Sequence, residues 1–288
     1  MLKPRLIGLV LVRDGLCVQS IGFKRFLPIG RPEIAVEFLN RWGIDEIAVL
    51  DLSATARGSA CDAETVKRYS RLCQVPLSIG GGIRSVIDVK RIIQAGADKV
   101  VINSALAAEP EIVTRAAEHF GSQCVIASID ARRGPAGFST WTRGGRQASG
   151  MAPAEWARRA VELGAGEILI SSIDQDGSRA GYDLDLVRSV TQAVSAPVIA
   201  CGGAGHPRDL AAAIAAGSAA VAVGNMLHYT EHSVIVLKRA LEALAQPIRL
   251  DSYVTYRHSE VGPEGRLAKL SEEALDALRF RYIPEETI

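Results

Sequence analysis

Short apolar runs and longer amphipathic stretches alternate along most of this chain. The apolar runs are nearly continuous, which is typical of parallel strands that are buried on both faces. We expect strands at 6–12, 47–52, 76–79, 99–102, 124–129, 167–171, 197–200 and 219–223. Several amphipathic stretches open with Pro or a capping residue and end before Gly, as helices do. We expect helices at 32–42, 60–73, 85–95, 110–120, 152–163, 183–194 and 207–216.

Eight strand–helix units in about 245 residues is the size of a (β/α)8 TIM barrel, and we expect this α/β fold for residues 1–245. A doubly wound sheet is the alternative, but the GxGxxG turn that usually follows its first strand is missing. Residues 246–288 form a C-terminal extension of mixed polarity, with a turn at 262–265 and one expected helix at 271–280. We expect it to pack on the barrel flank; an oligomer contact or a lid is the alternative.

The second half of the expected barrel repeats the first half. Segment 76–84 recurs as 197–205, segment 95–104 recurs as 216–225, and Glu46 falls on Glu167, at an offset of 121 residues throughout. A repeat this long is not a solenoid unit. It indicates a duplicated half-barrel, so a binding site in one half should have a counterpart in the other.

Composition excludes several classes of partner. The net charge is +1 and the basic residues are scattered, which indicates neither nucleic acid nor a membrane surface as a partner. No apolar run could span a bilayer and no signal pattern precedes the first strand, so we expect a cytoplasmic protein. Five cysteines without a CxxC pair fit a reducing compartment. His228 and His232 are four residues apart but lack a third ligand nearby, so we expect no metal and no cofactor.

Glycines and small polar residues follow several strands at the C-terminal face, where such barrels carry their chemistry. Glycines there let backbone N–H groups approach an anion closely, and the next helix adds its positive end. A tight turn alone would explain one strand end of this kind. Four such strand ends, related in pairs by the repeat, predict two phosphate sites. The residues expected to form them are Gly82, Asn103, Ser104, Asp176, Gly177, Gly203, Gly224 and Asn225. The expected ligand is a small molecule or sugar with a phosphate at each end.

Asp130 is the candidate catalytic residue. It follows the unbroken apolar strand at 124–129 and precedes a loop, so its carboxylate is available for proton transfer at the ligand face. The alternative is a surface carboxylate that caps the following helix.

Several motifs resemble the HisF family, the cyclase subunit of imidazole glycerol phosphate synthase. They are LDLSAT at 50–55, GGGI at 80–83, ADKV at 97–100, FGSQ at 120–123, GAGEI at 164–168, SID at 172–174, DG at 176–177 and GGAG at 202–205, and the resemblance covers roughly residues 1–245. It implies that a HisH-like glutaminase docks at the bottom of the barrel and supplies ammonia. It also implies an ammonia entrance formed by Arg5, Glu46, Lys99 and Glu167, with Asp98 and Gln123 facing the partner.

The chain departs from this family at two positions of the ligand face. Family cyclases carry an Asp at the end of the first strand, paired by pseudo-symmetry with the position of Asp130, and a Lys shortly afterwards. Here these positions hold Leu11 and Gln19. Leu11 is similar to the apolar residue of a HisF-like branch that works with a glutaminase and an ATP-using amidotransferase. That branch converts an acetamido group of a nucleotide-linked surface sugar to an acetamidino group, but Gln19 departs from it as well.

Three functions follow from these residues. The leading one is an ammonia-channelling, HisF-like barrel that serves amidation of a surface-polysaccharide sugar. The second is an authentic cyclase subunit of histidine biosynthesis in which Asp130 works without a partner acid. The third is a non-catalytic scaffold that activates a glutaminase.

Overall fold

Eight parallel strands close into a barrel. The computed structural model describes residues 3–230, 232–250, 260–268, 271 and 273. The barrel strands are β1 (Arg5–Arg13), β4 (Glu46–Asp51), β5 (Leu77–Gly80), β6 (Lys99–Ile102), β7 (Val125–Gly134), β10 (Glu167–Ser172), β11 (Val198–Cys201) and β12 (Ala220–Val223). Each pairs with the next in parallel, and β12 pairs with β1, so the sheet has no free edge within the barrel. The (β/α)8 prediction is confirmed.

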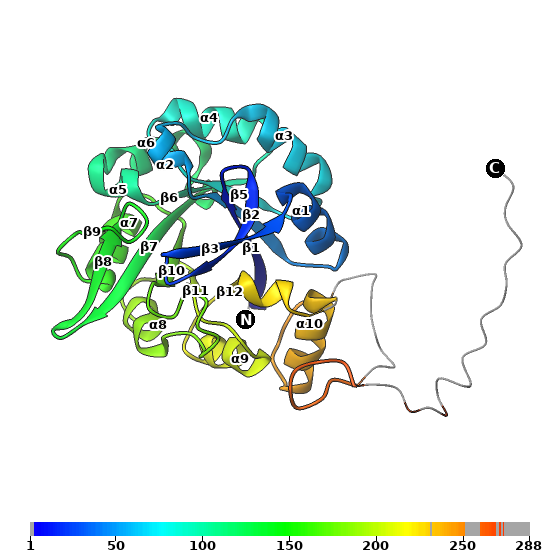
Figure 1. Cartoon of the computed structure of the whole chain (residues 1–288). Helices are drawn as coiled ribbons and strands as arrows, with labels where there is room; N and C mark the ends of the chain where they lie inside the picture. The colour runs from blue at the N-terminus through cyan, green and yellow to red at the C-terminus, as the bar shows by residue number, and fades with distance from the viewer. Residues whose placement is uncertain (1–2, 231, 251–259, 269–270, 272, 274–288) are drawn as a thin grey trace, which may run out of the picture.

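Helices surround the strands on the outside (Figure 1). They are α1 (Pro32–Arg41), α2 (Ala54–Arg57), α3 (Ala63–Leu72), α4 (Val86–Gln94), α5 (Ser104–Ala108), α6 (Glu111–Phe120), α7 (Pro153–Glu162), α8 (Leu184–Thr191), α9 (Pro207–Ala215) and α10 (Ser233–Ala243), with 3-10 turns η1 (Ser122–Cys124) and η2 (Asn225–His228). Pro opens α1, α7 and α9, where a missing N–H costs nothing. A capping box of Ser85 and Asp88 opens α4.

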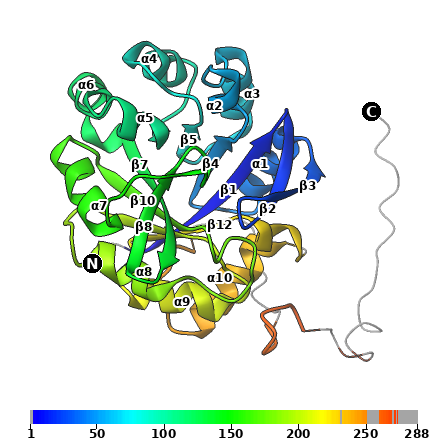
Figure 2. The same ribbon diagram turned by 60° about the vertical axis from the view of Figure 1, so that its left-hand side comes forward.

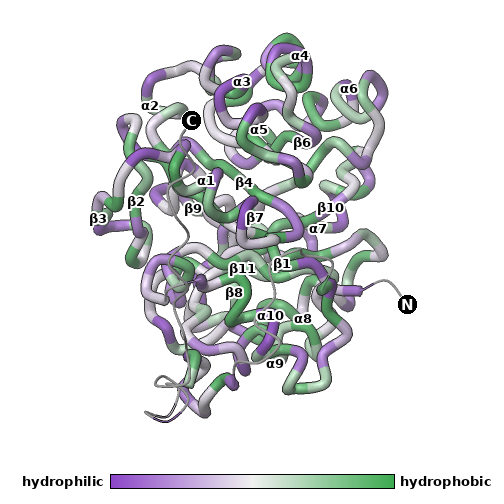
Figure 3. The backbone as a smooth tube through the Cα atoms, turned by 90° about the vertical axis from the view of Figure 1, so that its right-hand side faces the viewer, coloured by the Kyte–Doolittle hydropathy of each residue, from purple (hydrophilic) through white to green (hydrophobic). Residues whose placement is uncertain are grey.

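Apolar side chains fill the space on both sides of the strands. One large cluster joins the outer faces of the strands to the helices, with Val10, Ile47 and Ile79 among its members. A smaller cluster fills the inside of the barrel with Ile7, Leu9, Ala48, Val101, Ile126, Leu169, Ile199, Ala220 and Ala222. Because both faces of each strand are buried, the strand sequences are continuously hydrophobic, and β1, β4 and β11 are drawn largely green in Figure 3.

Two β-hairpins extend β1 and β7 beyond the barrel at its top, the face where the strands end. The first consists of β2 (Leu16–Ile21) and β3 (Arg25–Gly30), and the second of β8 (Gly137–Thr142) and β9 (Gln147–Ala148). In Figure 1, β2 and β3 lie over the middle of the barrel, and in Figure 2, β8 lies beside β7, with which it pairs antiparallel. Their turns come together, since a Cβ at Gly145 would lie 3.4 Å from Phe23. The hydrophobic pattern does not predict these hairpins because β3 is mostly exposed.

The pseudo-symmetry is present but its offset is not constant. Leu11 pairs with Leu50 across β1 and β4, while Asp130 pairs with Ser171 across β7 and β10. Leu50 and Ser171 are 121 positions apart, whereas Leu11 and Asp130 are 119 apart. The offset of 121 thus holds for the repeated segments, while the first strand and its counterpart β7 are related by an offset of 119. The segment from Asp130 to Ser171, which carries the second hairpin, is two residues longer than the segment from Leu11 to Leu50, which carries the first.

A short hairpin is described within the C-terminal extension. Val261 and Leu267 form an isolated antiparallel bridge, and Gly262 N donates to Arg266 O at 2.8 Å. The turn expected at 262–265 is confirmed by the bond from Gly265 N to Gly262 O at 2.9 Å. The helix expected at 271–280 lies outside the described residues, apart from positions 271 and 273. The division into a barrel and an extension at 245 stays a prediction.

Candidate functional site

Four charged side chains meet at the bottom of the barrel, where Arg5, Glu46, Lys99 and Glu167 are the first residues of their strands. Arg5 Nη1 lies 2.7 Å from Glu46 Oε1, and Arg5 Nη2 lies 2.9 Å from Glu167 Oε2. Lys99 Nζ lies 3.2 Å from Glu46 Oε2 and 2.7 Å from Glu167 Oε1. Each cation thus contacts both acids, and the structure brings the four predicted residues together as a closed ring.

The charged ring is largely withdrawn from water, with side chains that are at most 13 % exposed. Burial acts to raise the pKa of Glu167, but the hydrogen bonds and charges of Arg5 and Lys99 outweigh it, so the net direction is downward. Burial acts to lower the pKa of Arg5, and the two glutamates reverse this effect. Glu167 and Arg5 are therefore charged at neutral pH, held by one another rather than by water.

Asp98 and Gln123 lie exposed on the bottom face near this ring. Asp98 immediately precedes Lys99, and its Oδ2 accepts a hydrogen bond from Leu77 N at 2.8 Å. Gln123 is part of η1, just before β7. Their position leaves both accessible to a partner on the bottom face, and that role stays a prediction.

Asp130 lies in the middle of β7, which continues to Gly134 rather than ending in a loop; it pairs with Ser171 near the end of β10 and is 7 % exposed. Asn103 Nδ2 donates a hydrogen bond to Asp130 Oδ2 at 2.8 Å. Burial raises the pKa of Asp130 to about 7; the Asn103 hydrogen bond opposes this rise and the charge of Asp176 adds to it. The helix-cap alternative is wrong, because the carboxylate is buried and a strand, β8, follows β7. A carboxyl group that titrates near neutral pH can both give and accept a proton.

The barrel top is polar in one half and apolar in the other. Beside Asp130, the hydroxyl of Ser171 is hydrogen-bonded to Cys201, and burial raises the pKa of that thiol to about 12. The corresponding positions of the first half hold Leu11 and Leu50, which pack against the apolar cluster inside the barrel. The first half therefore contributes no proton-transfer group at this level.

Asp176, Gly177 and Asn225 are brought together around β2. Ser20 Oγ donates to Asp176 Oδ2 at 2.6 Å, and Phe23 N donates to the same oxygen at 3.1 Å. Asn225 Nδ2 donates to Ser20 O at 2.7 Å, while its Oδ1 accepts from Ser20 N at 3.2 Å. A Cβ at Gly177 would lie 2.5 Å from Ser20 O. These residues fasten the first hairpin, so a phosphate here would be met mainly by backbone N–H groups.

The other predicted phosphate residues lie at the strand ends of both halves. Gly82 and its repeat equivalent Gly203 have φ of +67° and +105°, and a Cβ at either would collide with a backbone carbonyl oxygen. Ser104 is the first residue of α5, and Gly224 follows β12. The structure places all of these residues at the top of the barrel, and their binding of phosphate stays a prediction.

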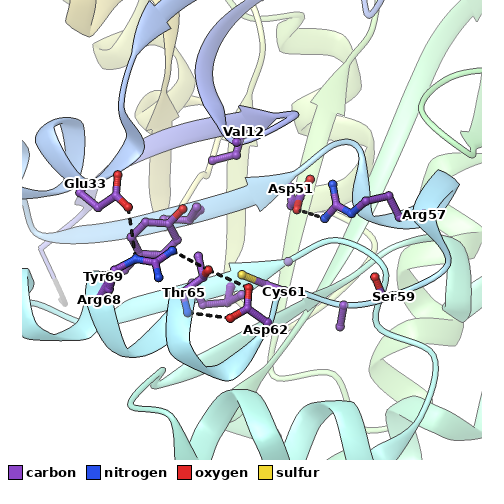
Figure 4. Close-up of a pocket in the computed structure, with 15 residues that line it drawn as sticks. Val12, Glu33, Asp51, Arg57, Ser59, Cys61, Asp62, Thr65, Arg68 and Tyr69 are labelled. Atoms are coloured by element: carbon purple, nitrogen blue, oxygen red, sulfur yellow. Dashed lines mark hydrogen bonds and ion pairs between the residues drawn. The ribbon is translucent and has the colours of Figure 1, made fainter.

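A separate cavity of about 340 Å³ lies between β4 and α3 (Figure 4). Its charged groups already have partners: Arg57 Nη2 lies 2.5 Å from Asp51 Oδ2, and Asp62 caps α3 through Thr65 N. None of the predicted catalytic, phosphate or entrance residues lines this cavity. We therefore place the candidate ligand site at the top of the barrel, around Asp130, rather than in this cavity on its flank.

The described residues contain no group of three or more His, Cys, Asp or Glu side chains that could hold a metal ion. Within the same part of the chain, the helices are too short or too polar to cross a membrane. All five cysteines are free.

Known proteins with similar sequences identify the family of this barrel. The family model described as "Histidine biosynthesis protein" matches residues 5–233. The HisF subunit of imidazole glycerol phosphate synthase from Caulobacter vibrioides is 40% identical over 255 residues, covering 88% of this chain and 98% of that protein. The chain belongs to the HisF family. The HisF subunit from Dehalococcoides mccartyi is 41% identical, covering 88% of this chain and 100% of that protein. The HisF subunit from Hyphomonas neptunium is 42% identical, covering 86% of this chain and 99% of that protein.

Some site residues of this HisF family member are not visible in its sequence. Ser20 fastens the first hairpin to two predicted phosphate residues, yet no motif marks it. Ser171 is the register partner of Asp130; the sequence marks it only as the hydroxyl at the end of the strand expected at 167–171 and as the repeat equivalent of Leu50. Gln19 lies half-buried on β2 opposite Leu27, so it belongs to the hairpin above the barrel.

Proposed function

We propose that this chain is a HisF-type subunit that receives ammonia from a HisH-like glutaminase and delivers it through the barrel to a phosphorylated acceptor. The proposed acceptor is a nucleotide-linked sugar of surface-polysaccharide biosynthesis, which is amidated with the help of an ATP-using amidotransferase. One observation carries the proposal: the charged ring at the bottom is complete, while Leu11 occupies the place across the barrel top that corresponds to Asp130.

The inside of the barrel supports passage of neutral ammonia. Above the charged ring, the inward-facing side chains are mostly aliphatic, and several are small, such as Ala48, Ala220 and Ala222. An ammonium ion would lose its hydration there without gaining a counter-charge, which is unfavourable for any buried ion. Ammonia carries no charge and avoids this cost. The ring and the apolar interior thus suit a neutral molecule that moves from bottom to top.

The top of the barrel supports a change of chemistry. Asp130, with a pKa raised by burial to about 7, can move a proton, whereas Leu11 cannot. General acid–base groups typically contribute 10²–10⁴-fold each, and groups that act as a unit lose most of the rate when one is missing. We therefore expect a cyclase rate at least about 100-fold below that of a relative with both acids. Transfer of ammonia to an acceptor activated elsewhere would not need the second acid.

The second candidate is the reaction of the curated relatives, the cyclase reaction of imidazole glycerol phosphate synthase. Identity of about 40% across almost the whole of those proteins favours it. Asp130 and Asn103, which lie within hydrogen-bond distance, are compatible with either function.

The test compares the purified chain with a curated HisF relative, using ammonium salt and the substrate of imidazole glycerol phosphate synthase. The matched variants are Leu11→Asp, which restores a proton-transfer group, and Leu11→Asn, which has nearly the same shape but none. We expect a rate at least about 100-fold below that of the relative, an increase for Leu11→Asp, and none for Leu11→Asn. Turnover at the relative's rate would refute the proposal in favour of the cyclase.

A second experiment addresses the acceptor and the glutaminase. The chain is combined with a HisH-like glutaminase, the amidotransferase, ATP, an N-acetylated nucleotide sugar and glutamine labelled with ¹⁵N in its amide. We expect the label to appear in the sugar only when this chain is present. Faster glutamine hydrolysis without label transfer would instead identify the chain as a scaffold that activates the glutaminase.

A further inference from the structure

The hairpin at 260–268 contacts the barrel at the start of α9. It lies beyond the residues that the family model matches, and it is drawn red-orange beside α9 and α10 in Figure 1. His206 Nε2 lies 2.9 Å from Pro263 O. Gly265 is buried, and a Cβ added to it would lie 2.6 Å from Cδ of Pro207. The hairpin therefore makes both a polar and a van der Waals contact with the first turn of this helix.

One imidazole ring joins the hairpin to the helix cap. His206 is the N-cap of α9, and its Nδ1 accepts a hydrogen bond from Arg208 N at 3.0 Å. A neutral imidazole that accepts through Nδ1 carries its proton on Nε2, so Nε2 donates to Pro263 O. The acid at Asp209 accepts from Gly205 N at 2.9 Å and from His206 N at 2.8 Å. The hairpin, the cap and the end of the preceding loop thus form one connected network.

The same loop holds a predicted phosphate residue. Gly203 lies between the end of β11 and His206, and its carbonyl accepts a hydrogen bond from Gly181 N at 2.9 Å. The equivalent loop of the first half carries Gly82 and ends at the capping box of Ser85. No residue of the hairpin at 260–268 hydrogen-bonds to that first loop. The hairpin at 260–268 therefore contacts the phosphate loop of the second half and not that of the first.

We propose that the hairpin at 260–268 is a clamp on the second phosphate site. By holding His206 and the loop before it in place, the clamp keeps backbone N–H groups aimed at the anion before it arrives. A loop that is already ordered loses less conformational entropy on binding, so its affinity rises. The site around Gly82 lacks this support. The inference rests on the proposed phosphate sites, and it makes the two sites unequal in a way that the repeat alone does not predict.

The test uses a matched pair of glycine variants in the full chain. Gly265→Ala places a methyl group against the rigid ring of Pro207, at a residue with φ of +70°. Gly262→Ala adds the same methyl group to the same hairpin, but its nearest neighbour is Arg266 O at 3.7 Å, an ordinary contact. His206→Asn is a third variant, because Asn keeps the N-cap function and loses the reach to Pro263.

Binding of inorganic phosphate is measured by calorimetry, with thermal unfolding followed in parallel to show that the barrel remains intact. We expect two sites in the parent chain and in Gly262→Ala. In Gly265→Ala and His206→Asn, one site weakens about five- to tenfold, the size expected for one lost hydrogen bond, while the other is unchanged. Unchanged binding at both sites, or equal weakening of both, would overturn the clamp. A parent chain that binds no phosphate would instead refute the phosphate sites of the proposed function.

Discussion

Replacing Asp130 by Asn should stabilise the folded protein at alkaline pH. Asp130 is buried, and burial raises its pKa from the ordinary value of 3.8 to about 7. Between these two pH values the folded chain keeps a proton that the unfolded chain has already released. The free energy of unfolding of the parent therefore falls as the pH rises through this window. The amide of the Asp130→Asn variant would keep the shape and could still accept from Asn103, but it never has to ionise.

The size of the effect follows from the shift in pKa. About three pKa units correspond to about 4 kcal/mol, and about 3 kcal/mol of this falls between pH 5 and pH 8. The variant should thus exceed the parent by about 1–2 kcal/mol at pH 5 and by about 4 kcal/mol at pH 8. Other groups that titrate in this range are common to both proteins and cancel in the comparison.

The assay is urea unfolding of the parent and the variant at pH 5, 6, 7 and 8, with Glu162→Gln as a control that removes an exposed carboxylate from the end of α7. The control should track the parent at every pH. A stability difference for Asp130→Asn that does not change with pH would refute the reasoning, because it would mean that the carboxylate of Asp130 ionises in the folded chain without cost.

Two further predictions concern the bottom and the top of the barrel. Glu46→Gln leaves two buried cations with one acid, so it should lower the free energy of unfolding by about 3 kcal/mol in urea unfolding, while Glu162→Gln changes it little. Gly177→Ala should release the first hairpin and speed its cleavage in limited proteolysis, because the new methyl group would meet Ser20 O at 2.5 Å. Gly15→Ala is the control, because Gly15 has a similar positive φ but a Cβ there would have no atom within 4 Å. Equal cleavage rates for the two variants would contradict the role of Gly177 in holding the hairpin.

The barrel itself could be predicted from the sequence because its strands are buried on both faces. Continuous apolar runs such as Val198–Cys201 then mark the strands directly, and glycines or prolines mark the helix boundaries. The four charged residues at the bottom were predictable only through the resemblance to HisF. Nothing in the local sequence distinguishes Arg5 or Lys99 from an ordinary solvated residue at the start of a strand.

Other features could not be predicted, because they depend on contacts between distant segments. The first hairpin has few buried side chains, and it is held by Ser20 bonding to residues more than 150 positions away. The hydrogen bond between His206 and Pro263 joins a helix cap to a turn, and the local sequence around either residue does not indicate that the two are in contact.

The charged ring at the bottom of the barrel has a property that a simple ion pair lacks. Its four contacts form a cycle, in which Arg5 and Lys99 each touch both Glu46 and Glu167. Breaking any one contact turns the cycle into a linear chain of four, and every charge still has a partner. Opening one side therefore never leaves an isolated buried charge, which would be the expensive step. Any one of the four ion pairs can break while the net charge of the ring stays zero. The ring can therefore close the bottom of the barrel and still open one ion pair at a time.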